Sequence, residues 1–392
     1  MRAPWRISSF AGAALALLTL PGLVCSVGCG RSATDAASES THKQGAEPQS
    51  APADYTAEAQ AWADSVASSM SVEELAGQLL MPALYATSNP ANIAKARQYL
   101  ESLKAGGFVW LKGSAEEMLQ LADTLSKLSS TPLFMALDAE WGAGMRLSGC
   151  TSFKKNYQLS GLPEKTFYAM GRTTGREAAA VGINMIFAPV LDVAPSERSV
   201  MWRRSYGPDP ERVATAGQAF ARGIVDEGLI PVGKHFPGHG ATHLDSHKTI
   251  PLIADSRTKL DTVDLIPFRS FISSGFPALM TAHVIVPSLD GGETSGNGQE
   301  APATLSHGIL TALLRDRLGF DGLVISDAMN MLPARKGIFV EALKAGCDIL
   351  TVPVDPAAAV KEVAEAISDG TLSVKEIRAK VARILFYKYP LR

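Results

Sequence analysis

The sequence is poor in cysteine and carries almost no excess of either charge. Its 392 residues include 4 cysteines, and 37 basic side chains against 39 acidic ones leave a formal net charge of −2. Such a chain, without a basic stripe interleaved with aromatic residues, gives no reason to expect a nucleic-acid partner. No Gly-x-Gly-x-x-Gly motif follows the first apolar run, which weakens the case for a dinucleotide-binding fold.

Hydrophobic residues make up 46% of the chain and charged residues 19%, which suits a globular protein with a large core. This length fits either two ordinary domains or one large α/β barrel.

Residues 1–29 have the layout of an export signal. Arg2 and Arg6 precede the apolar run AGAALALLTLPGLV, which is short for a membrane span. The segment SVGC resembles a bacterial lipoprotein cleavage box, so we expect lipid attachment at Cys29 and a place in the bacterial cell envelope. Ser26 stands where Leu is usual, which keeps Cys25 and simple secretion as alternatives.

Residues 30–54 are rich in Ala, Ser, Glu and Pro and have few large apolar groups. Such a segment cannot bury enough surface to fold, so it predicts a flexible tether. Cys150 and Cys347 lie far apart in the sequence, and either a bridge or two buried free thiols agrees with it.

Beyond residue 55 short apolar runs alternate with amphipathic segments of helical period, such as 210–228 and 307–320. The runs have the character of strands buried on both faces. Eight strands alternating with helices predict a single (β/α)₈ TIM-type barrel over residues 55–392, with a doubly wound open sheet as the competitor. The runs are 77–84, 106–111, 132–138, 183–190, 229–236, 276–284, 322–328 and 348–353.

Polar side chains stand at the carboxyl ends of five of these runs. In a barrel the chemistry collects at those ends, and an unpaired buried charge is costly. We therefore expect one shared polar active site. The residues are Asp138, Glu140, Asp192, Lys234, His235, His283 and Asp327.

The segment KHFPGHGATHLDSH, residues 234–247, carries four histidines at four-residue intervals. This spacing would suit a helical zinc site, but Pro237, Gly238 and Gly240 disfavour one continuous helix. The segment also lacks cysteine and the His-Glu-x-x-His pattern. It predicts a strand end followed by a glycine-rich loop that brings further groups to the pocket, without a metal.

The same segment, together with VISDAMNM, resembles glycoside hydrolase family 3, and specifically its bacterial β-N-acetylglucosaminidase branch. LDAEWGAGMRL, PVLDV, RRSYGPDPERV and MTAHVIVP agree as well, so the resemblance covers about residues 70–388. It implies an exo-acting enzyme that removes terminal β-linked N-acetylglucosamine with retention of configuration and needs no cofactor.

The resemblance assigns the catalytic roles to three residues. Asp327 matches the nucleophile that forms a covalent glycosyl-enzyme, although an Asp there could also cap the next helix. His247 matches the acid/base and Asp245 its partner, and an imidazole with a pKa near 6.5 suits proton transfer at neutral pH. A surface histidine without a role is the alternative for His247.

Further residues match contacts to the bound sugar: Asp138, Arg146, Arg204, Lys234, His235 and His283. One motif departs from the family, because Ala143 replaces its first arginine and Trp141 appears beside it. We expect this exchange to alter what binds next to the cleaved sugar. The segment after Asp327 is shorter than in the family, and the chain stops at KYPLR, which favours the single-domain type.

The expected partner is a glycan with terminal β-linked N-acetylglucosamine, with peptidoglycan fragments favoured over chitin fragments. A monomer is favoured, in contact with a membrane only through the lipid anchor. Three alternatives stay open: a β-glucosidase, a phosphorylase of the same family, and a sugar-binding lipoprotein that has lost catalysis.

Overall fold

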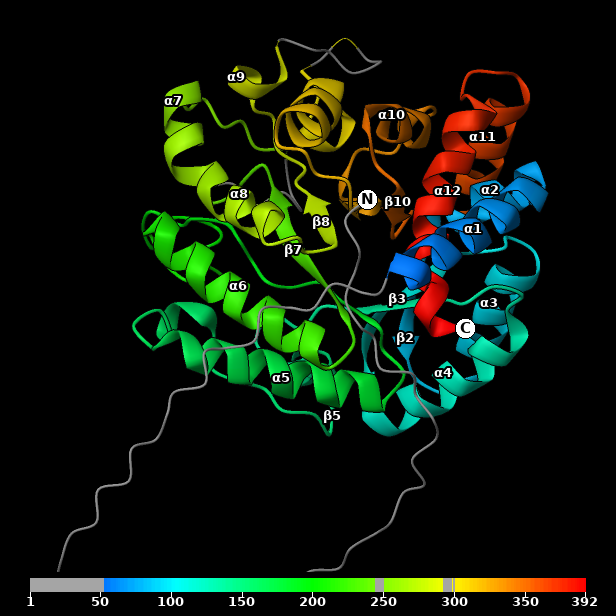
Figure 1. The fold of residues 1–392 in the computed structure, drawn as a ribbon, viewed down its shortest axis with the longest axis horizontal. Coiled ribbons are helices and arrows are strands. Elements are labelled where there is room, and N and C mark those ends of the chain that lie inside the picture. The colour runs from blue at the N-terminus through cyan, green and yellow to red at the C-terminus, as the bar shows by residue number, and fades with distance from the viewer. Residues whose placement is uncertain (1–52, 244–249, 292–297, 299) are drawn as a thin grey trace, which may run out of the picture.

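The computed structural model describes residues 53–243, 250–291, 298 and 300–392, and in it parallel strands lie inside a ring of helices (Figure 1). The predicted signal peptide, almost all of the tether, Cys29, Asp245 and His247 lie outside the described residues.

The strands follow one another in the order β1-β10-β9-β8-β7-β6-β4-β3-β2, and every pairing between them is parallel. The two ends of this order, β1 (Leu80–Met81) and β2 (Ala83–Ala86), flank Pro82 in the sequence. The sheet therefore curls until its ends meet, which is consistent with a TIM-type barrel. The other strands are β3 (Gly107–Ser114), β4 (Phe134–Leu137), β6 (Met185–Ile186), β7 (Ile230–Phe236), β8 (Ala278–Thr281), β9 (Leu323–Ala328) and β10 (Ile349–Thr351), and β5 (Leu147–Ser148) pairs with β3 outside this path.

Each of the eight predicted runs contains a strand at the expected place, so this prediction is confirmed. Most of the strands are shorter than the runs, although β3 extends beyond its run to Ser114. The run 183–190 contributes only the two residues of β6, and Pro189 further along it has no N–H to donate to a neighbouring strand.

Helices cover the outer face of the strands (Figure 1). The predicted helix 210–228 is α6, which begins after Asp209, whose side chain accepts a hydrogen bond from the N–H of Glu211. The predicted helix 307–320 is also present, wound as a π-helix, η5 (Gly308–Arg317). The elements are α1 (Ala53–Ser69), α2 (Val72–Gln78), α3 (Pro90–Glu101), α4 (Ala115–Leu128), α5 (Glu164–Ala180), α6 (Pro210–Asp226), α7 (Arg257–Lys259), η3 (Leu260–Asp264), α8 (Leu265–Ser273), α9 (Pro287–Asp290), α10 (Ile338–Ala345), α11 (Pro356–Ser368) and α12 (Val374–Lys388).

The last turn of α12 reaches the amino-terminal end of the barrel. Lys388 is fully buried there; its Nζ donates to Gln78 Oε1 at 2.8 Å and lies 5.1 Å from the centre of the Phe134 ring. Burial lowers the pKa of Lys388 to about 7. The end of the chain is thus joined to the residues that precede β1 and begin β4.

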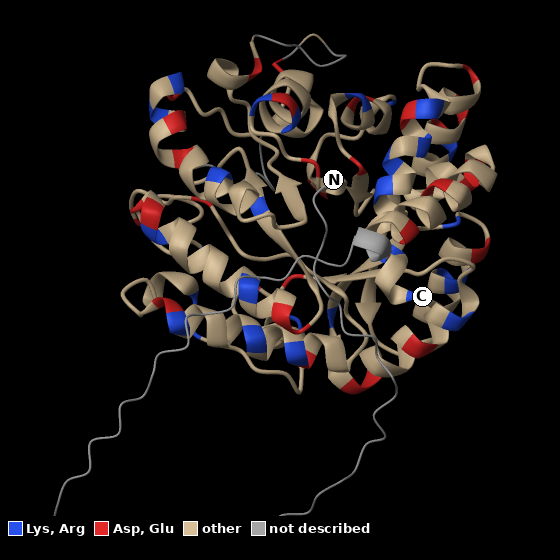
Figure 2. Cartoon of the chain, viewed as in Figure 1, with Lys and Arg blue, Asp and Glu red and all other residues tan. Residues whose placement is uncertain are grey.

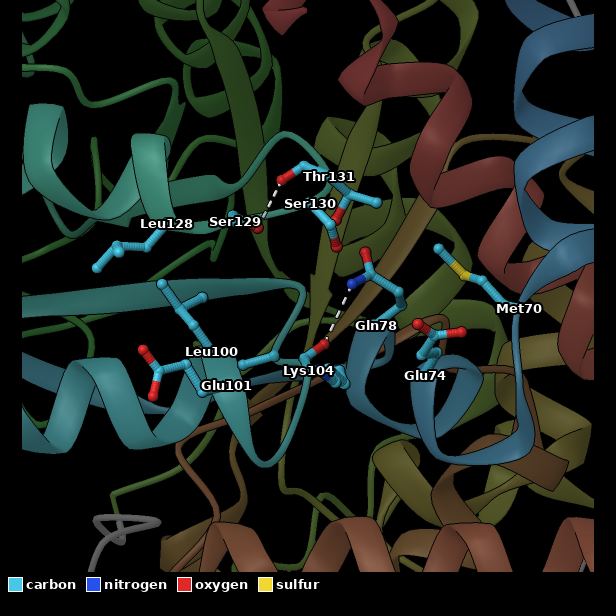
Figure 3. A pocket seen from close by; sticks show the side chains of 11 residues that line it. Met70, Glu74, Gln78, Leu100, Glu101, Lys104, Leu128, Ser129, Ser130 and Thr131 are labelled. Atoms are coloured by element: carbon cyan, nitrogen blue, oxygen red, sulfur yellow. Dashed lines mark hydrogen bonds between the residues drawn. The ribbon is translucent and has the colours of Figure 1, made fainter.

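A pocket of about 200 Å³ opens at this same end, lined by residues that precede β1, β3 and β4 (Figure 3). Its polar groups are partly tied to one another, because Gln78 Nε2 donates to the Lys104 carbonyl at 3.1 Å and Ser129 Oγ donates to the Thr131 carbonyl at 2.7 Å. Active sites of such barrels lie at the opposite, carboxyl-terminal end of the strands.

Charged residues lie mainly on the outer helices and loops, whereas the strands are almost free of them (Figure 2). Within the described part of the chain, none of the helices combines the length and the apolar character needed to cross a bilayer. Cys347 is buried and Cys150 half-buried, and both are free thiols, which decides between the two alternatives for this pair.

Candidate active site

A buried lysine joins two carboxylates at the carboxyl ends of β4 and β7. Lys234 Nζ donates to Asp138 Oδ1 at 2.8 Å and lies 2.8 Å from Glu140 Oε1, and the side chains of Lys234 and Glu140 are only 2% and 1% exposed. Arg146 Nη2 donates to the second oxygen of Asp138 at 2.6 Å. Asp138 is the more accessible of the two carboxylates, with its side chain 22% exposed.

Arg204 reaches into this cluster from the loop that follows β6. Its Nη2 and Nε donate to the two oxygens of Glu140 at 2.6 and 3.0 Å, a bidentate pair that fixes the guanidinium plane. Asn156 holds the backbone of the same residue, because its Nδ2 donates to the Arg204 carbonyl at 2.7 Å. Arg204 Nη2 also lies 3.2 Å from His235 Nε2, which links the arginine to β7.

The protonation states of this cluster follow from its opposite charges. Burial alone would raise the pKa of Glu140, but Arg204 and Lys234 lower it far below the ordinary value. Burial is likewise outweighed at Asp138, where Lys234 and Arg146 lower the pKa. Burial would lower the pKa of Lys234, yet the two carboxylates raise it. At neutral pH the cluster is therefore fully ionised and presents fixed charges to a ligand.

Asp192 anchors the beginning of the histidine segment. Its Oδ2 lies 2.7 Å from His235 Nδ1, and its Oδ1 accepts hydrogen bonds from the backbone N–H groups of His235 and His239 at 3.3 and 2.8 Å. Burial lowers the pKa of His239 to about 4, so this imidazole is neutral at pH 7.

Gly240 completes this anchor through a close approach of two backbones. A Cβ at this position would lie 1.9 Å from the Val193 carbonyl oxygen, so only glycine fits without a shift. Ser199 Oγ donates to the Gly240 carbonyl at 2.7 Å, and residues 236–240 are buried. The first half of the glycine-rich loop is therefore packed against the loop that follows β6.

Asp327 is the penultimate residue of β9 and lies near His235 and His283. Its Oδ1 accepts the N–H of Ala328 at 2.8 Å. Burial would raise its pKa, but His235, His283 and the N–H of Ala328 lower it, so the carboxylate is ionised at neutral pH. His283 contacts the adjoining backbone, with Nε2 3.1 Å from the Ala328 carbonyl and Nδ1 2.8 Å from Thr304 Oγ1.

The described histidines of the segment serve separate purposes. His235 and His239 have ring centres 6.1 Å apart, whereas His243 lies on the surface with Nδ1 2.9 Å from the Arg198 carbonyl. Among the described residues no group of three or more His, Cys, Asp or Glu side chains could hold a metal ion.

The structure brings together the predicted residues Asp138, Arg146, Arg204, Lys234, His235, His283 and Asp327 at one end of the barrel. Asp245 and His247 lie outside the described residues, so their roles stay predictions. The sequence marks Glu140 and Asp192 only as polar strand ends, whereas in the structure Glu140 pairs with Arg204 and Lys234, and Asp192 contacts His235. Nothing in the sequence signalled Asn156.

The ionised Glu140 gives a prediction about stability. Replacement by Gln removes the negative charge that Arg204 and Lys234 share, and breaking a buried pair in this way costs roughly 3–5 kcal/mol. Because the pKa of Glu140 is lowered in the folded state, its contribution is present above about pH 4.5 and is lost as the pH falls further. Urea unfolding of both proteins should show the difference at pH 7 and its narrowing below pH 4.5.

Glu101→Gln is the matched control, because Glu101 pairs with Arg97 at 3.6 Å on an exposed helix face. Its effect should stay within about 1 kcal/mol at both pH values. If the two replacements lower the free energy of unfolding equally, the buried cluster contributes no more to stability than an exposed ion pair.

The match to known proteins covers most of the chain. Residues 71–386 match the glycosyl hydrolase family 3 N-terminal domain. The chain is 33% identical over 303 residues to β-hexosaminidase A of Pseudoalteromonas piscicida. This alignment covers 71% of this chain and 50% of the relative. It is 34% identical over 305 residues to the β-hexosaminidase of Thiobacillus denitrificans, covering 74% and 81% of the two chains. The chain thus spans half the length of the first relative and about four-fifths of the second.

Solved structures similar to this chain include a member of the same family. A glycoside hydrolase family 3 β-N-acetylglucosaminidase from Paenibacillus sp. superposes with a TM-score of 0.75 at 31% identity, over 82% of this chain and 63% of that one. A β-glucoside phosphorylase, BglX, superposes with a TM-score of 0.79 at 26% identity, over 86% and 61%.

The family resemblance of the histidine segment, the barrel and its charged cluster all agree with the family match over residues 71–386. The chain belongs to glycosyl hydrolase family 3.

Proposed function

We propose that the protein is a retaining exo-β-N-acetylglucosaminidase. The observation that carries this proposal is the position of Asp327 at the carboxyl-terminal end of β9, on the same side of the barrel as the charged cluster of Asp138, Glu140, Lys234 and Arg204. The relatives named β-hexosaminidase and the superposed β-N-acetylglucosaminidase support the N-acetylated sugar.

The reaction uses two displacements at the anomeric carbon. Asp327 attacks this carbon and forms a glycosyl ester while His247, aligned by Asp245, donates a proton to the departing oxygen. His247 then removes a proton from water, which attacks the ester and releases the sugar. Asp138 accepts hydrogen bonds from the sugar hydroxyls, and Lys234 and Arg146 keep it ionised and fixed.

The experiment that tests this proposal compares aryl glycosides. We expect the chain to release the aryl group from a β-N-acetylglucosaminide at least about tenfold faster, in kcat/KM, than from the matching β-glucoside. A faster glucoside reaction would identify a β-glucosidase, and no reaction with either would identify a sugar-binding protein.

A phosphorylase is the second candidate, and the similarity to BglX favours it. A histidine acid/base leaves room for a phosphate that a carboxylate would repel. Product analysis with and without phosphate separates the two reactions. Free N-acetylglucosamine as the product in both cases supports the hydrolase. Formation of sugar 1-phosphate in the presence of phosphate would show that the protein is a phosphorylase.

We further propose peptidoglycan fragments as the natural substrate and the bacterial cell envelope as the location. The charged and apolar character of residues 1–29 and the polar composition of residues 30–54 support export and a tether.

Lipid attachment at Cys29 is tested by Cys29→Ser in cells. We expect the wild-type protein in the membrane fraction and the variant in the soluble fraction. If both proteins appear in the soluble fraction, the enzyme is secreted without a lipid anchor.

A further inference from the structure

A pocket of about 520 Å³ lies between the loops that follow β4 and β6. It is separate from the pocket of Figure 3, which lies at the other end of the barrel. Arg204 forms part of its wall, and the same guanidinium pairs with Glu140 in the charged cluster. The pocket therefore borders the candidate active site. Its volume is within the range of about 300–1,000 Å³ typical of small-molecule sites.

Three aromatic side chains line this pocket: Trp141, Tyr157 and Trp202. All three residues are partly exposed. The rings of Tyr157 and Trp202 have centres 6.5 Å apart and are inclined by 41°. Aromatic faces carry partial negative charge and attract the C–H groups on one face of a pyranose ring. Ala143, two residues after Trp141, is fully buried and does not line this pocket.

The rim of the pocket has more positive than negative charge. Lys155, Arg203 and Glu197 are exposed there, and Lys155 Nζ lies 5.4 Å from the centre of the Trp141 ring. The charge of Arg204 is partly compensated, because Arg204 pairs with Glu140. A carboxylate on a sugar ring packed against Trp141 would therefore meet a cation.

We propose that this pocket is the subsite for the leaving-group sugar. Trp141 and Trp202 form its packing surface, and Lys155 favours a sugar that carries a carboxylate. This inference rests on the proposed glycosidase function and adds the residues that select the second sugar. Trp141 directly follows Glu140, so one loop serves both halves of the substrate.

The test uses three substrates with the same N-acetylglucosamine and different leaving groups: fluoride, a neutral N-acetylglucosamine, and N-acetylmuramic acid with its carboxylate. Trp141→Ala should lower kcat/KM about tenfold on both disaccharides and less than about twofold on the fluoride, and Trp141→Phe should restore most of the loss. Lys155→Gln should lower kcat/KM only on the carboxylate-bearing disaccharide. Trp62→Ala is the control, because Trp62 packs on Tyr389 outside the pocket and should change all three rates alike.

The outcomes separate this inference from the proposed function. A wild-type protein that cleaves none of the three substrates overturns the proposed function. If the wild type cleaves all three and Trp141→Ala lowers the three rates equally, only the subsite is wrong. If Lys155→Gln affects both disaccharides equally, the preference for a carboxylate is wrong.

Discussion

Asp327→Asn should reduce turnover by at least about 10⁴-fold, since an amide cannot form the glycosyl ester on which the two-step reaction depends. The fold should remain intact, because the amide oxygen of Asn can still accept the N–H of Ala328 at 2.8 Å. We expect N-acetylglucosamine to bind the variant with an affinity close to that of the wild type. The measurements are kcat/KM on an aryl N-acetylglucosaminide and calorimetric binding of the free sugar.

Mass spectrometry gives a second readout for this variant. A glycosyl fluoride that forms a slowly hydrolysed ester should add one sugar mass to the wild-type peptide that contains Asp327 and none to the variant. Asp316→Asn, on the exposed face of η5, is the control and should behave as the wild type in both measurements. If the label is found on a different peptide, another carboxylate is the nucleophile.

His247→Ala should lower turnover about 10²- to 10⁴-fold, which is the usual contribution of a general acid/base to the rate. The loss should be largest for leaving groups that need a proton and small for those that depart as stable anions. The variant should also lose the pH dependence that an imidazole of pKa about 6.5 imposes. Rates on a sugar and a dinitrophenyl leaving group across pH 5–9 check both expectations.

His243→Ala provides the control within the same loop. His243 is exposed and its Nδ1 lies 2.9 Å from the Arg198 carbonyl, so its loss should leave the rates within about twofold of the wild type. Wild-type rates for His247→Ala would refute the histidine–aspartate pair. Asp245→Asn should give a smaller loss than His247→Ala, since the ring would remain but lose its alignment.

The barrel could be predicted from the sequence because strands buried on both faces leave a simple signal. A run such as 132–138 is apolar throughout, and the structure places β4 within it. The extent of each strand could not be predicted in this way. Residues 187–190 are as apolar as a strand but lie outside β6, and Pro189 has no N–H to offer a neighbouring strand.

The site was predictable where polar residues interrupt apolar runs, as Lys234 and Asp327 do. The partners that fix these residues were harder to recognise, because pairing depends on distance in space. Glu140 meets Arg204 across 64 positions of sequence, and Asn156 bonds a backbone carbonyl, which no side-chain pattern reveals. Family resemblance supplied the roles of His247 and Asp245, whereas spacing alone had suggested His247 only as one of four histidines in a helical zinc site.

The buried contact between Lys388 and Gln78 joins residues 310 positions apart, and β1 pairs with β10 in the same region. The barrel therefore cannot close while its carboxyl-terminal residues are still inside the ribosome. At about 5–20 residues per second, synthesis of the 392 residues takes roughly 20–80 s. The pairing of β1 with β10 and the contact between Gln78 and Lys388 can therefore form only after residues 349–388 have left the ribosome.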